Sequence, residues 1–130
     1  MTKEEHIEYW IKTAEHDLDA MQGIFEAGKY DWALFVGHLA LEKILKAHWV
    51  RNNENITPPK IHNLVKLYQE SNLLLLNKDD IVFLNEVSEF NLEGRYPETK
   101  LTFYRLCTKE FTEEKIKRIK ELYQCLRKEI

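Results

Sequence analysis

The sequence predicts an all-α protein, an up-and-down antiparallel bundle of four main helices plus a short extra helix. Hydrophobic residues make up 44% of the chain and charged residues 32%, with only four glycines and three prolines. This balance is typical of a helical domain with its own core and excludes a disordered or fibrous chain. Apolar residues recur at spacings of three or four along most of the chain, as in helices with one buried face. A length of 130 residues fits a single domain, residues 1–130.

The first helix is predicted over residues 2–27. Thr2 and Glu5 have the spacing of a capping box, in which each side chain accepts a hydrogen bond from the backbone N–H of the other residue. An apolar stripe from Ile7 to Phe25 follows at helical spacing. Gly28 is the residue type that ends a helix.

The second helix is predicted from Asp31, which would cap it, to about Arg51. Its residues are apolar on nearly every side, which predicts packing against several neighbours. Gly37 lies inside it, and a glycine there costs about 1 kcal/mol relative to alanine. We therefore expect another helix to approach closely at Gly37.

The remaining elements are shorter. Residues 52–60 carry two prolines and form the clearest loop, and a third helix is predicted over 61–71. A fourth helix is predicted over 78–92, with Asn77 as its cap and Gly94 as a left-handed residue at its end.

The last two helices are predicted over residues 99–107, where an extended segment is the alternative, and from Thr112 to the C-terminus. Short connections between helices favour packing of each helix against its neighbour in the chain. We therefore expect the helices to form an antiparallel bundle.

Several classes of protein are disfavoured. No export signal begins the chain, and its apolar runs are far shorter than the roughly 20 residues that cross a bilayer. We therefore expect a cytoplasmic protein without a membrane contact.

Cys107 and Cys125 lack a CxxC spacing, so we expect reduced thiols. A net charge of −3 gives no general attraction to nucleic acid, so any site for a polyanion would be local.

One line of polar residues crosses the second helix. His38, Glu42 and Lys46 are spaced by four residues and share a face. In the simpler interpretation His38 and Glu42 pair with each other and the lysine extends from the buried helix to the surface, and in the alternative this face holds a site.

His62 and the Arg95-Tyr96 pair can likewise be interpreted as structural residues or as part of a site. His62 follows two prolines and would begin the third helix, either as a solvent-facing residue or as a site residue. Arg95 can cap the carbonyl groups that end the fourth helix while Tyr96 packs and Pro97 stops the helix, or it can belong to a site.

No motif for metal or nucleophilic chemistry is present. A di-metal bundle needs Glu-x-x-His twice, and no glutamate stands three residues before any histidine. Glycine-rich phosphate loops and nucleophile motifs are absent. We expect no metal and no cofactor.

Five short stretches, in their order and spacing, resemble the HEPN domain family over most of the chain. They are Ala14-Glu15-His16-Asp17-Leu18, Gly28-Lys29-Tyr30, Leu41-Glu42-Lys43-Ile44-Leu45-Lys46-Ala47, His62-Asn63-Leu64 and Gly94-Arg95-Tyr96-Pro97. The resemblance implies a helical bundle that commonly forms a symmetric dimer. Many members of the family are partners of a minimal nucleotidyltransferase, and others are metal-independent ribonucleases.

The ribonuclease branch uses an arginine followed by a histidine four to six residues later. Only Arg51 precedes any histidine here, and ten residues with two prolines separate it from His62. That motif is absent from the sequence. Relatives often carry two glutamines shortly before the Glu-Lys pair, where this chain has His38-Leu39, whereas Glu42, Lys43 and Lys46 fit the pattern.

The leading hypothesis is therefore a HEPN-like binding module, a homodimer that recognises a nucleotide, RNA or a minimal nucleotidyltransferase partner, with no catalytic residue assigned. Its candidate binding residues are Arg95, Tyr96, His62, Lys43, Lys46, Glu42 and His38. Two alternatives stay open. One is a ribonuclease with a rearranged His62/Arg95 site, and the other is a purely structural dimerising bundle.

Overall fold

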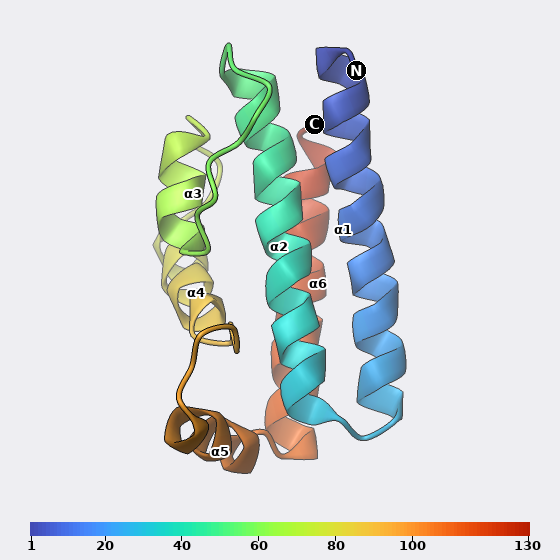
Figure 1. Cartoon of the computed structure of the whole chain (residues 1–130), viewed down its shortest axis with the longest axis vertical. Coiled ribbons are helices and arrows are strands. Elements are labelled where there is room, and N and C mark those ends of the chain that lie inside the picture. The colour runs from blue at the N-terminus through green and yellow to red at the C-terminus, as the bar shows by residue number, and fades with distance from the viewer.

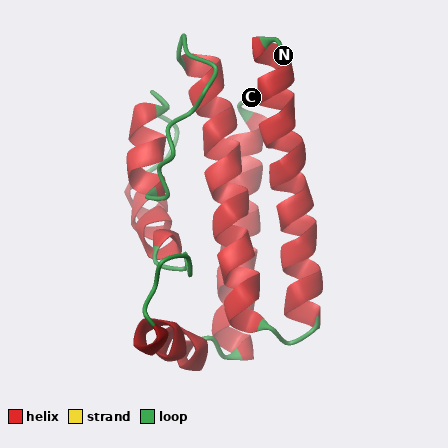
Figure 2. Cartoon of the chain, in the orientation of Figure 1, coloured by secondary structure: helices red, strands yellow, loops and turns green.

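Six helices and no strand make up the protein in the computed structural model, which describes residues 1–130 (Figure 2). They are α1 (Lys3–Glu26), α2 (Tyr30–Asn52), α3 (Leu64–Glu70), α4 (Lys78–Ser88), α5 (Pro97–Leu106) and α6 (Lys109–Lys128). The all-α prediction is confirmed, but the number of helices differs from the predicted four plus one. None of the six is long and apolar enough to cross a membrane.

Helix α2 lies at the centre of the bundle, with α1 and α6 on one side and α3 and α4 on the other (Figure 1). Helix α5 lies across the end of the bundle at which α2 begins. The chain reverses between α1 and α2, as predicted. Helix α6, however, runs in the same direction as α2, because α4 carries the chain back to the end where α2 starts and α5 crosses that end.

Helix α2, which is apolar on nearly every side, packs against several neighbouring helices as predicted. Thirteen of its residues are buried, more than in any other helix. At Gly37 an added Cβ would lie 2.8 Å from Ile119 Cδ1 of α6 and 2.8 Å from Met21 Sδ of α1. The predicted close approach at Gly37 is confirmed, since both neighbouring helices occupy the space of the missing side chain.

The two ends of α1 agree with the sequence analysis. The Thr2 hydroxyl accepts a hydrogen bond from Glu5 N–H at 3.1 Å, and the Glu5 carboxylate accepts one from Thr2 N–H at 3.1 Å. Gly28 has a φ of 79° directly after the C-cap Ala27. A capping box and a left-handed residue thus define this helix.

The starts of α2 and α3 differ from the prediction. Helix α2 begins at Tyr30, its N-cap Lys29 makes no side-chain cap bond, and Asp31 lies inside the first turn. Helix α3 begins at Leu64 rather than at residue 61, because the Asn63 side chain accepts a hydrogen bond from Lys66 N–H at 3.0 Å. His62 therefore precedes α3 instead of opening it.

Two later boundaries also differ. Helix α4 ends at Ser88 rather than at residue 92, because the chain then turns to bury Phe90 and Leu92. Gly94 is left-handed as predicted, with a φ of 71°, but it lies six residues beyond the helix. Helix α6 begins at Lys109, capped by Thr108, so the predicted first residue Thr112 is a buried residue of its first turn.

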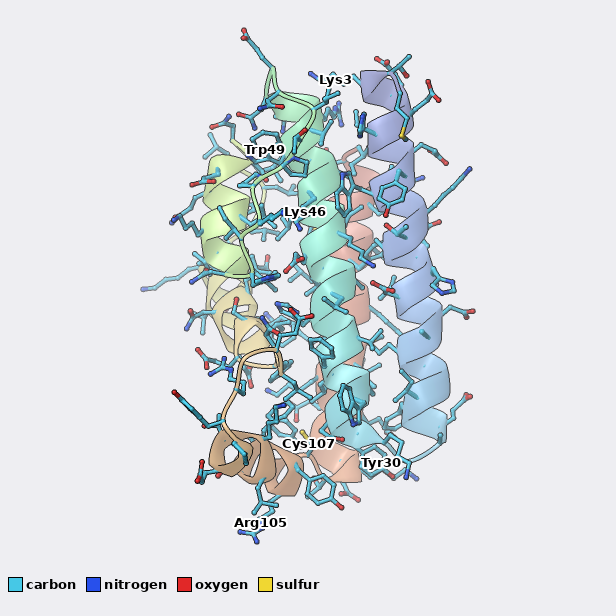
Figure 3. All side chains as sticks on the ribbon, viewed as in Figure 1. Lys3, Tyr30, Lys46, Trp49, Arg105 and Cys107 are labelled. Carbon is cyan, nitrogen blue, oxygen red and sulfur yellow. The ribbon has the colours of Figure 1, made fainter.

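The predicted helix at residues 99–107 is confirmed as α5, which starts two residues earlier at Pro97. Proline suits the first turn of a helix, since its missing N–H would have no partner there. No residue of α5 is buried. Figure 3 shows Arg105 and Cys107 near Tyr30 at this end of the bundle.

Candidate functional site

A cluster of polar side chains surrounds Glu42 on the side of α2 that faces α3. The helical repeat aligns His38, Glu42 and Lys46 on this face, and Lys46 is labelled on α2 in Figure 3. The Glu42 side chain is nearly buried, with 4% of the residue exposed. Its Oε2 accepts a hydrogen bond from Lys46 Nζ at 3.2 Å, and its Oε1 lies 2.9 Å from His62 Nδ1.

His62 reaches this cluster from the segment between α2 and α3. A carboxylate can only accept a hydrogen bond, so Nδ1 of His62 carries the hydrogen in the contact with Glu42. Half of the His62 side chain is exposed, and Nε2 has no partner within the chain. A carboxylate that orients an imidazole in this way leaves the second ring nitrogen available to a ligand or to a proton.

His38 contacts the backbone of His62 from the interior of the bundle. It is fully buried, and its Nε2 lies 3.2 Å from the backbone oxygen of His62. Nε2 also lies 3.9 Å from Glu42 Oε1, so both of its neighbours are acceptors and it donates. Burial lowers the pKa of His38, and the hydrogen bond to His62 and the charge of Glu42 only partly oppose this. A neutral, enclosed His38 positions His62 and does not itself contact a ligand from solvent.

Lys46 completes the cluster. It is 9% exposed, and its ammonium lies 5.2 Å from the ring centre of Trp10 on α1. A cation over an aromatic face is favourable, and Glu42 supplies the opposite charge. The simpler interpretation expected Glu42 to pair with His38 and Lys46 to reach the surface, whereas in the structure Lys46 is buried and pairs with Glu42, and His38 lies 3.9 Å from the same carboxylate. The Glu42 carboxylate also holds the half-exposed His62.

Lys43 does not join this cluster. It extends toward α1, where its Nζ lies 2.7 Å from Asp17 Oδ2. Asp17 is 9% exposed and was not among the candidate residues. A signal existed in the sequence, because Asp17 lies between Ala14, Leu18 and Met21 on the apolar stripe of α1, where a charge needs a partner.

Arg95 and Tyr96 lie in the segment between α4 and α5. Arg95 Nε donates to the backbone oxygen of Asn91 at 3.0 Å, and Nη2 lies 3.3 Å from Glu89 Oε2. Arg95 therefore donates to a backbone oxygen in the segment after α4 and not, as its simpler interpretation expected, to the carbonyl groups that end the helix. Tyr96 does not pack, since 77% of the residue is exposed.

The structure brings four of the seven candidate residues into one cluster. Arg95 makes no hydrogen bond or ion pair with His62. The segments that carry Arg95 and His62 nevertheless lie on the same side of α2 (Figure 1). The charge of Glu93, two residues before Arg95, is close enough to act on the pKa of His38. The two segments thus border one face of α2.

This face offers groups for hydrogen bonding and proton transfer. No group of three His, Cys, Asp or Glu side chains is arranged so that it could hold a metal ion. The groups that can contact a ligand are the free ring nitrogen of His62, the remaining donors of the Arg95 guanidinium and the ring of Tyr96.

A family model described as the HEPN domain matches residues 7–129. The chain belongs to the HEPN domain family. Its fold is similar to that of another solved protein, TT1696 from Thermus thermophilus, whose crystal structure superposes with a TM-score of 0.79 at 19% identity. That alignment covers 95% of this HEPN domain and 98% of the other chain. At this identity the likeness establishes the fold alone, and no curated protein matched the sequence.

Proposed function

We propose that this HEPN domain is a binding module that recognises a nucleotide or RNA, or a minimal nucleotidyltransferase partner, on the face bordered by His62 and Arg95. The observation that carries the proposal is the contact between His62 and Glu42. A buried carboxylate, itself held by Lys46, orients a half-exposed imidazole whose second nitrogen is free. Such preorganisation lowers the cost of ordering the side chain when a ligand binds.

Arg95 and Tyr96 supply complementary chemistry. The guanidinium uses Nε and Nη2 within the chain, and its Nη1 has no protein partner. A planar guanidinium fits phosphate oxygens, and an exposed aromatic ring next to it can stack on a base. Lys46 is engaged with Glu42 and Lys43 with Asp17 on α1, so neither lysine provides free positive charge at the site.

Titration of the purified protein tests this proposal. Adenine and guanine nucleotides would be titrated by calorimetry, and a short labelled single-stranded RNA by fluorescence anisotropy. We expect Arg95→Ala and His62→Ala each to weaken binding at least about tenfold, which corresponds to the loss of one charge-assisted hydrogen bond. Arg127→Ala is the matched control, since Arg127 on α6 pairs with the exposed Glu15 on α1. Absence of binding to every nucleotide and to RNA, or equal weakening by Arg127→Ala, would refute a ligand site here.

The same contact favours a second candidate, a metal-independent ribonuclease with His62 as its proton-transfer residue. An imidazole oriented by a carboxylate can take a proton from an attacking hydroxyl group. Labelled RNA would be incubated with the protein in the presence of a chelator, beside His62→Ala and Glu42→Gln. Cleavage that both substitutions abolish supports this candidate, whereas cleavage unaffected by His62→Ala indicates a contaminating nuclease.

A further inference from the structure

Glu89 holds the Arg95 guanidinium with the same chemistry that a phosphate group would use. Glu89 directly follows the last residue of α4, and its Oε2 accepts a hydrogen bond from Arg95 Nη2 at 3.3 Å. The Nε of Arg95 donates to the backbone oxygen of Asn91, so Nη1 is the only nitrogen of the guanidinium without a partner in the protein. Carboxylates and phosphates both bind the planar donor edge of an arginine. A phosphate ligand at Arg95 therefore meets a donor that is already partly occupied.

The contact between Glu89 and Arg95 is one that a ligand can displace. The Glu89 side chain is 68% exposed and the Arg95 side chain 33% exposed. Exposed ion pairs contribute little to stability, so the carboxylate can move into solvent at a small cost. The hydrogen bond from Arg95 Nε to Asn91 does not involve Glu89 and keeps the guanidinium in place. Displacement of Glu89 thus frees the donors without disordering the arginine.

The polar cluster on α2 and the segment with Arg95 together hold more carboxylates than cations. Their charged side chains are the three carboxylates Glu42, Glu89 and Glu93 and the two cations Lys46 and Arg95. The charge of Glu93 reaches the cluster, since it acts to raise the pKa of the buried His38. Lys60, two residues before His62, is exposed and contacts none of these side chains. A highly charged anion is therefore poorly matched to this face.

We propose that Glu89 is an internal competitor of the ligand at Arg95 and that, together with Glu93, it limits the site to a singly charged phosphate group, as in a phosphodiester. This inference rests on the proposed function, because it concerns the ligand of the same site. A phosphodiester replaces the Glu89 carboxylate on Arg95, so one negative charge takes the place of another. Further phosphate groups find no free cation in the cluster, because Lys46 is buried and paired with Glu42. Glu89 and Glu93 repel each added negative charge.

Calorimetric titrations in the presence of a chelator test the charge limit. The probes are the dinucleoside monophosphate ApA, 3′,5′-cyclic AMP, AMP and ATP, which share the adenine base and differ in phosphate charge. ApA and cyclic AMP each carry one negative charge, AMP carries about two, and ATP without magnesium carries more. We expect the wild-type protein to bind at least one of the two phosphodiesters about tenfold more tightly than ATP. Preference for ApA identifies a linkage of RNA as the source, and preference for cyclic AMP identifies a free nucleotide.

Glu89→Gln keeps the shape of the side chain and removes its charge. We expect it to bind the preferred phosphodiester about threefold more tightly, because an exposed ion pair no longer competes, and ATP about tenfold more tightly. Glu93→Gln should improve ATP binding but change phosphodiester binding by less than about twofold, since Arg95 pairs with Glu89 and not with Glu93. Glu8→Gln removes a similarly exposed, ion-paired carboxylate on α1 and is the matched control, which should bind as the wild type does.

Two results overturn this inference and leave the proposed function intact, provided that Arg95→Ala still abolishes binding. One is phosphodiester binding that Glu89→Gln weakens or leaves unchanged, because Glu89 then positions Arg95 or has no influence on it. The other is wild-type protein that binds ATP as tightly as either phosphodiester, which contradicts the charge limit. If no probe binds to the wild type or to Glu89→Gln, the inference and the ligand site both fail. Equal melting curves by circular dichroism show that the variants compared are folded.

Discussion

Removal of the Glu42 carboxylate is the sharpest test of the polar cluster. Glu42 is 4% exposed and is hydrogen-bonded to Lys46, which is 9% exposed. Glu42→Met keeps the approximate volume but leaves the Lys46 ammonium without its counter-charge in a buried position. Breaking a buried pair by removing one partner costs about 3–5 kcal/mol. Since His62 also loses its acceptor but is half exposed, we expect a loss of about 3–4 kcal/mol.

The assay is chemical denaturation in urea, followed by tryptophan fluorescence and circular dichroism, with the free energy of unfolding taken from both signals. Lys46→Met and the double variant complete a mutant cycle. Replacement of the whole pair removes the uncompensated charge, so the double variant should be at least about 2 kcal/mol more stable than Glu42→Met.

Glu8 and Lys12 provide a matched control on α1. Their side chains have the same spacing of four residues, with Nζ and Oε1 3.7 Å apart, but both are more than half exposed. Glu8→Met should change the free energy of unfolding by less than about 0.5 kcal/mol. If Glu42→Met costs no more than Glu8→Met, or if the double variant is no more stable than Glu42→Met, the buried charge pair does not behave as described.

Three further results are expected. Gly37→Ala should lower the free energy of unfolding by about 1 kcal/mol in urea titrations, because overpacking by roughly 1–3 kcal/mol exceeds the gain of about 1 kcal/mol in helix propensity. Burial lowers the pKa values of His38 and His48, so the unfolded chain binds protons at these residues more readily than the folded protein does. The free energy of unfolding should therefore be highest above about pH 6.5 and should fall as the pH drops below that value. Urea midpoints measured across this pH range test the expectation. Ellman's reagent should label the exposed Cys125 quickly and Cys107 only after unfolding, because burial raises the pKa of Cys107 to about 12.

Each of these has an outcome that would contradict it. Gly23→Ala in α1 is the control for Gly37, since no atom lies within 4 Å of an added Cβ there, and it should stabilise the protein. Equal effects of the two alanines would contradict the close approach. His48→Gln should flatten the pH dependence, as the His48 ring nitrogen bonds the Leu126 backbone oxygen at 2.7 Å. A free energy of unfolding that rises on acidification would contradict the predicted pH dependence. Fast labelling of both thiols in the native protein would contradict the burial of Cys107.

The long helices could be predicted because their signals are local. The capping box of Thr2 and Glu5 and the stripe that follows it define α1 within a few residues, and no distant contact is needed. Gly37 was informative for a different reason, since a residue that is unfavourable inside a long helix implies close packing by another helix. The order of short motifs also led to the HEPN domain family.

The boundaries of the shorter helices could not be predicted with the same accuracy. The apolar pattern predicted that α3 begins at residue 61, whereas in the structure Asn63 caps the helix and Leu64 begins it. After Ser88 the apolar pattern continues through Phe90 and Leu92, and this pattern predicted a helix up to residue 92. In the structure both side chains are buried in a turn, because contacts with the core outweigh the local helical preference.

In the candidate site, too, the sequence predicted some features and the tertiary structure decided others. The helical repeat determined that His38, Glu42 and Lys46 share a face, since residues four apart along a helix lie one above the other. The repeat did not determine which partner each side chain meets. Lys43, one residue from Glu42, pairs with Asp17 on α1, while Glu42 receives His62 from a segment 20 residues further along the chain.

The sequence by itself therefore determined the helical class, the two long N-terminal helices, the family and the line of polar residues on α2. Only the tertiary structure decided that His62 is held by Glu42, that His38 is enclosed beneath it, and that Arg95 pairs with Glu89. The physical reason is the range of the interactions. Helix caps and periodicity act within a few residues, whereas these three features depend on the path of connecting segments, which packing against the central helix decides.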